Sequence, residues 1–97
     1  MIESGAVAER LRNKLEAAFQ PTELVVTDES AHHAGHSGAR DGGESHFRVR
    51  IVSAAFSGLS RVDRQRRVYE ALAEEIDGGV HALALTTLTP QEATNPN

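Results

Sequence analysis

The sequence predicts a small α/β (α+β) domain in which two helices pack on a three-stranded mixed sheet. Three observations indicate this fold. Apolar residues recur at helical spacing in two segments, they cluster or alternate in three short segments, and the segment order is helix, strand, strand, helix, strand (αββαβ). The first two strands can pair as an antiparallel hairpin, and the third can join by a crossover. At 97 residues, the chain is expected to form one domain over positions 1–97.

The first helix is expected over residues 4–19, and the first strand over residues 23–28. One apolar stripe at four-residue spacing contains Val7, Leu11, Leu15 and Phe19. Pro21 ends this helix, because proline disfavours helical backbone in the residue before it. The strand contains the β-rich run Leu-Val-Val.

The second strand, residues 45–53, alternates between apolar and polar side chains. One face presents Phe47, Val49 and Ile51, and the other presents His46, Arg48 and Arg50. This pattern predicts a half-buried strand with a basic outer face.

The second helix is expected from Ser60, a good N-cap, to about Asp77, and Gly78-Gly79 ends it. Its inward side chains are predicted to be Val62, Tyr69, Leu72 and Ile76. Residues 80–87 form the third strand. Thr89 and Pro90 then begin a short final helical turn, and residues 93–97 are expected to be a frayed tail.

The composition excludes several classes of site. The chain has no cysteine, so it can form neither a disulfide framework nor a thiolate metal site by itself. It has no apolar run of membrane-spanning length, which favours a cytoplasmic protein without membrane contact. A nucleophile–base–acid set and a phosphate-binding glycine loop are both missing, so the chain is not expected to be an enzyme.

Histidines are concentrated in one region of the chain. Four of the five lie between His32 and His46, in or beside a glycine-rich loop at about residues 29–44 that is expected to be flexible. By composition alone, His32, His33 and His36 are equally compatible with metal binding and with plain solvation. The fifth, His81, shares its alternation with Leu83 and Leu85, so spacing alone favours a histidine at the edge of the core.

An ordered set of short motifs resembles the BolA family. No single motif is specific, but their order along nearly the whole chain is. The set includes Asp28-Glu29-Ser30, Glu44-Ser45-His46-Phe47-Arg48-Val49, Phe56-Ser57-Gly58, Val80-His81-Ala82-Leu83 and Thr89-Pro90-Gln91-Glu92. Two departures are visible. The family's Arg-His-Arg reads Arg64-Gln65-Arg66 here, and Ala93 replaces an aromatic residue.

The resemblance implies a fold like a class II KH domain and a role in iron–sulfur cluster trafficking and iron regulation. It implies a heterodimer with a monothiol glutaredoxin, sharing a 2Fe–2S cluster whose sulfur ligands come from glutaredoxin and glutathione. The chain is then expected to be a monomer without cofactor when alone. On the side of this chain, the implied ligands are His81 and a loop histidine. His33 fits best, and His36 and His32 are the alternatives.

Several polar residues are candidates for partner or nucleic-acid contact rather than metal ligation. They are His46, Arg48, Arg61, Arg64, Arg66 and Arg67. Their local density supports an alternative function, a KH-like DNA-binding transcriptional regulator of morphology and stress genes, of the kind also described among bacterial members of the resembled family. The net charge of −4 argues mildly against non-specific nucleic-acid binding.

Overall fold

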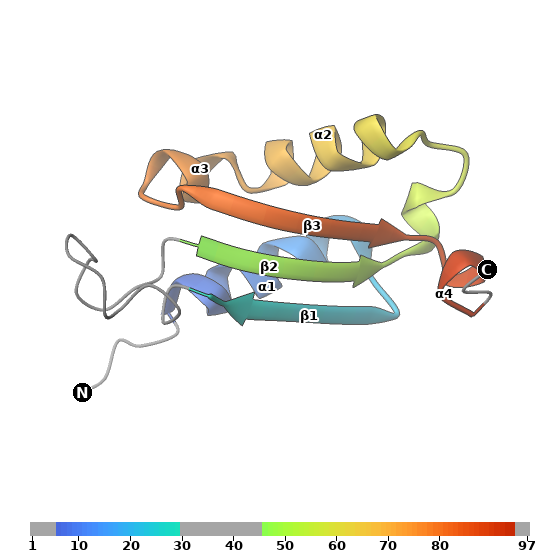
Figure 1. Cartoon of the computed structure of the whole chain (residues 1–97), viewed down its shortest axis with the longest axis horizontal. Helices are drawn as coiled ribbons and strands as arrows, with labels where there is room; N and C mark the ends of the chain where they lie inside the picture. Colours follow the sequence, from blue (N-terminus) through green and yellow to red (C-terminus); the bar gives the residue numbers. More distant parts are fainter. Residues whose placement is uncertain (1–5, 30–45, 95–97) are drawn as a thin grey trace.

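The structure is a computed structural model that describes residues 6–29 and 46–94. These residues form a three-stranded sheet with helices packed on it (Figure 1). In chain order, its elements are α1 (Ala6–Phe19), β1 (Glu23–Asp28), β2 (His46–Val52), the 3₁₀ turn η2 (Ala54–Phe56), α2 (Arg61–Ala71), α3 (Ala73–Asp77), β3 (Ala82–Leu88) and α4 (Pro90–Thr94). The sheet order is β1–β2–β3, with β2 antiparallel to β1 and parallel to β3. The predicted α+β class and mixed sheet are therefore confirmed.

The core lies between one face of the sheet and the two long helices. The α1 residues Leu11, Leu15 and Phe19 are buried, as the four-residue spacing predicts. From β2, the side chains of Phe47, Val49 and Ile51 meet them, which confirms the predicted inward face. Burying each such side chain contributes roughly 2 kcal/mol, so this layer supplies the main force that holds the helices on the sheet.

Ser53, which directly follows β2, connects the ends of β2 and α1 with η2. Its hydroxyl group is completely buried, donates to the carbonyl of Phe19 at 2.6 Å and accepts from the N–H of Ala55 at 3.0 Å. These bonds cap η2 and tie the end of β2 to the end of α1. Phe56 then packs against Phe19, with the ring centroids 5.1 Å apart.

The predicted second helix is divided at Leu72. The Leu72 backbone leaves the helical region, at φ −107° and ψ 18°, yet its N–H still donates to the carbonyl of Val68. Leu72 is fully buried, and Ile76 packs against the core, as predicted. Ser60 caps α2 through a bond from the N–H of Asp63 to its hydroxyl group.

The prediction that Val62 and Tyr69 point inward is wrong. Their exposed fractions are 61% and 41%, and the positions that face the core are Arg64, Val68 and Leu72. These three residues recur at four-residue spacing, so the helix does have one inward stripe. The first position of this stripe is Arg64, and a search for apolar residues cannot identify a buried arginine.

Arg64 is buried because backbone carbonyls and one carboxylate satisfy its guanidinium group. It donates to the carbonyls of Leu59 and Thr87 at 3.0 and 3.1 Å. It also forms a two-bond pair with Glu92, at 2.7 and 3.1 Å. This side chain therefore joins the start of α2 to the end of β3 and to α4.

The final helix begins with the predicted signals. The N–H of Glu92 donates to the Thr89 hydroxyl group at 3.2 Å, and the Glu92 carboxylate accepts from the N–H of Thr89 at 2.9 Å. This is a reciprocal capping box, with Pro90 at the first helical position. The helix continues through Thr94, so Ala93 and Thr94 are helical rather than part of the expected tail.

The outer face of β2 is less basic than the sequence predicts. Arg50 pairs with Glu23 at 3.0 Å, and Arg48 pairs with Glu29 at 2.8 Å. Both glutamates come from the β1 side of the antiparallel register, which places them diagonally across from the arginines. The predicted row of positive charge is thus largely neutralised by a neighbouring strand.

Candidate functional site

His81 lies at the end of the sheet where β3 begins. The structure starts β3 at Ala82 rather than at Val80, so His81 precedes the strand and is exposed. Val80 is buried against the core, and Gly79 has a φ of 137°, which side-chain-bearing residues rarely adopt. The spacing argument for a histidine at the core edge is therefore wrong, because the alternation of the strand does not reach His81.

The turn that carries His81 is held from α3. The N–H of Val80 donates to the carbonyl of Glu75 at 3.1 Å. The side chain of Glu75 is only 4% exposed, and it pairs with Lys14 of α1 at 3.0 Å. A neighbouring pair joins Lys14 to Glu74 at 2.6 Å, and these two carboxylates raise the pKa of Lys14 through their hydrogen bonds. The contacts link α1 to α3 and so position the residue that precedes His81.

His46 lies beside His81 at the same end of the sheet. It is the first residue of β2, and the parallel register places it opposite Ala82. The two imidazole ring centroids are 6.4 Å apart, and the ring planes are inclined by 48°. The structure thus brings together two histidines that are 35 positions apart and that were predicted to have separate roles. Their shared place at the starts of two strands was a usable signal, provided that the strands are parallel.

The predicted loop ligands His33, His36 and His32 lie outside the described residues, as does almost all of the expected flexible loop. The two ends of their segment are described. Glu29 and His46 lie opposite each other, with the N–H of Glu29 donating to the carbonyl of His46 at 2.8 Å. Figure 1 shows the end of β1, the start of β2 and the turn before β3 at one end of the sheet. Both ends of the histidine-bearing segment therefore lie near His81.

The predicted contact arginines of α2 separate into two kinds. Arg64 is buried and bound to Glu92, so it cannot contact a partner as predicted. Arg61, Arg66 and Arg67 are exposed, and Arg66 makes a 3.3 Å pair with Asp63 on the same helix. The structural role of Arg64 and the capping role of Glu92 were missed in the sequence, because both depend on contacts between distant segments.

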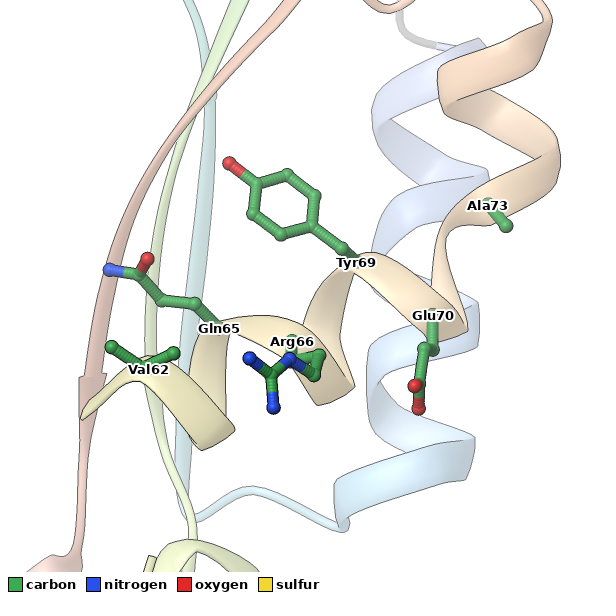
Figure 2. Close-up of a pocket in the computed structure, with 6 residues that line it drawn as sticks. All are labelled: Val62, Gln65, Arg66, Tyr69, Glu70 and Ala73. Carbon is green, nitrogen blue, oxygen red and sulfur yellow. The ribbon is translucent and has the colours of Figure 1, made fainter. Parts of the chain in front are cut away.

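The exposed side of α2 also carries a shallow hollow of about 470 Å³ (Figure 2). It is lined by Val62, Gln65, Arg66, Tyr69, Glu70 and Ala73. Two apolar side chains that were expected in the core thus stand on a solvent-facing surface beside a cation. Such a surface can contact a partner, although it has no enclosed cavity for a small molecule.

Two negative observations bound the site within the described ranges, 6–29 and 46–94. None of the helices there is long and apolar enough to cross a membrane. Among the same residues, no three histidine or acidic side chains gather where they could hold a metal ion. A metal group at this end of the sheet therefore needs ligands besides those of the described residues.

Together, these features define a small α+β domain that offers two histidines at one end of its sheet and arginines on one helix. Residues 15–92 match the family described as BolA-like protein. The chain is 47% identical over 96 residues to Protein BOLA1, chloroplastic, of Arabidopsis thaliana. The aligned region covers 94% of this chain and 60% of that protein. The chain is 48% identical over 86 residues to the DNA-binding transcriptional regulator BolA of Escherichia coli (strain K12), covering 89% and 78% of the two chains.

The solved structure of BolA1 from Arabidopsis thaliana is similar as well. It matches with a TM-score of 0.79 at 48% identity, over 88% of this chain and 93% of that chain. The chain therefore belongs to the BolA family.

Proposed function

We propose that this chain is a non-enzymatic adaptor that partners a monothiol glutaredoxin and shares a 2Fe–2S cluster with it. The observation that carries the proposal is the position of His81. Its imidazole is exposed at the end of the sheet where Glu29 and His46 hold the histidine-bearing segment 30–45. The chain has no cysteine, so glutaredoxin and glutathione would supply the sulfur ligands.

On this side of the complex, His81 and one histidine of the segment would hold the cluster, with His33 as the first choice and His36 or His32 as alternatives. Chain length permits this pairing. Crossing from Glu29 over β2 to His81 spans about 10 Å at the usual strand spacing. His33 is four residues beyond Glu29, which allows a reach of about 14 Å. The imidazole nitrogens would raise the reduction potential of the cluster relative to ligation by cysteine alone.

The test is anaerobic reconstitution of the chain with a monothiol glutaredoxin, glutathione, iron and sulfide, followed by visible circular dichroism. Mixed ligation should change the 2Fe–2S spectrum relative to glutaredoxin alone, in a one-to-one complex. His81→Ala should abolish the changed spectrum and leave the apo complex intact. Asp77→Ala, on the exposed end of α3, is the matched control. If the complex with His81→Ala gives the same spectrum as the complex with the wild type, the assignment of His81 as a ligand is refuted.

A second candidate function is DNA-binding regulation through α2. Its support is the exposed set Arg61, Arg66 and Arg67, together with the similarity to the DNA-binding transcriptional regulator BolA of Escherichia coli. Arg64 has no place in this test, because its loss would damage the fold rather than a contact surface.

The second candidate is tested by gel shifts over a range of salt concentrations with Arg61→Gln/Arg67→Gln. Each lost phosphate contact should reduce the salt slope by about 0.9. The control is Arg10→Gln/Arg12→Gln, which removes equal charge from α1. Equal binding by the two double variants would exclude α2 as the DNA contact.

A further inference from the structure

We infer that His46 and His81 form a two-imidazole half-site for a borderline divalent metal ion such as Zn²⁺. His46 begins β2, and His81 directly precedes the parallel strand β3. Their ring centroids approach to 6.4 Å. The inference goes beyond the proposed function, since it needs neither glutaredoxin nor a cluster. It also makes a ligand of His46, which was expected only to contact a partner.

The separation of the rings suits joint coordination after a small movement. In a tetrahedral site with metal–nitrogen bonds of about 2.1 Å, two imidazole centroids lie roughly 5 Å apart. The observed 6.4 Å exceeds this value by about 1.4 Å. His81 is exposed and precedes the strand, so its side chain can turn towards His46 without disturbing the sheet. The buried Val80 and the Gly79 turn hold its backbone in place.

The donor atoms determine the class of metal. Neutral imidazole nitrogen suits Zn²⁺, Cu²⁺ and Ni²⁺ better than Mg²⁺ or Ca²⁺, which prefer oxygen. Glu29 lies opposite His46, but Arg48 already binds its carboxylate at 2.8 Å. The described residues therefore supply two nitrogens and leave two of the four tetrahedral positions to water or to another molecule. An incomplete shell of this kind is suited to sharing a metal with a partner.

The experiment must separate this pair from the histidines of the segment 30–45. The triple variant His32→Gln/His33→Gln/His36→Gln removes those imidazoles from the full chain. Calorimetric titration with Zn²⁺ alone should then show one bound ion, and the ring C–H signals of both His46 and His81 should shift in NMR spectra. Adding His46→Gln to this background should weaken Zn²⁺ binding about tenfold or more, because even outer-shell partners of metal ligands have that effect.

Adding His81→Gln should weaken binding to a similar extent, whereas Asp77→Asn, at an exposed position four residues before His81, should leave binding unchanged. Unchanged Zn²⁺ binding after His46→Gln would overturn the inference, and so would loss of all binding in the triple variant. The ring signals of His46 in the otherwise unaltered triple variant give an independent answer if a further substitution impairs folding. The titration contains no glutaredoxin, so a negative result in it would not affect the proposed sharing of a cluster. A negative result in the cluster reconstitution would likewise not affect the proposed Zn²⁺ site.

Discussion

Removing the guanidinium group of Arg64 should destabilise the fold, although the substitution of a charged residue on a helix usually changes the free energy of unfolding only slightly. The substitution Arg64→Met keeps the aliphatic stem and removes the donors. The carbonyls of Leu59 and Thr87 then lose their bonds at 3.0 and 3.1 Å. A hydrogen bond from a charged donor contributes about 1.5 kcal/mol or more, so the two bonds together give roughly 3 kcal/mol. The pair with Glu92 adds little to this figure, because the glutamate side chain is 43% exposed.

The assay is urea and thermal unfolding followed by far-ultraviolet circular dichroism. For a domain of this size, a loss of roughly 3 kcal/mol lowers the Tm by more than about 10 °C. Arg67→Met is the matched control, since Arg67 is exposed on the same helix, and its effect should stay within about 0.5 kcal/mol. Equal stability of the two variants would refute the structural role of Arg64 and return it to the candidate contact residues.

Three further predictions concern stability. Hydrogen bonds from Arg64 lower the pKa of Glu92 from its ordinary 4.5 to about 2, so this carboxylate stabilises the fold above about pH 5 and ceases to do so as the pH falls towards 2. The Tm difference between the wild type and Glu92→Gln should therefore shrink over that interval, and a constant difference would contradict the assignment. Ser53→Ala should cost about 2 kcal/mol in urea unfolding, because one buried and one part-buried hydrogen bond are lost. A change below about 0.5 kcal/mol would be inconsistent with those bonds. Val68→Ala should lower the free energy of unfolding by about 2 kcal/mol, whereas Val62→Ala should leave it almost unchanged. A larger loss with Val62→Ala than with Val68→Ala would support the inward position of Val62 that the sequence predicts.

Local rules account for the correctly predicted parts of the fold. The stripe of α1, the alternation of β2 and the caps Ser60 and Thr89 all depend on residues within a few positions of one another. Helical and strand periodicity follow from backbone geometry alone, so such elements can be read from one sequence. The hairpin and the crossover were predicted from the same elements, whereas the position of β3 beside β2 comes from the structure.

Contacts between distant segments explain the errors. Val62 and Tyr69 fit an apolar pattern, yet Arg64 takes the inward position because Glu92 and two carbonyls satisfy it. Arg48 was expected on a basic face, but the register with β1 places Glu29 beside it. A sequence pattern assigns each residue to a face without showing which partner will neutralise it.

For the candidate site, the sequence alone determined the available chemistry. A chain without cysteine offers no thiolate to a metal, so its histidine nitrogens and its oxygen atoms are the main donors. Only the tertiary structure decided which histidines meet. The parallel register of β2 and β3 places His46 beside His81, and the Gly79 turn takes His81 out of the strand alternation. The physical reason is that strand pairing brings together residues far apart in the chain, and no local periodicity encodes that distance.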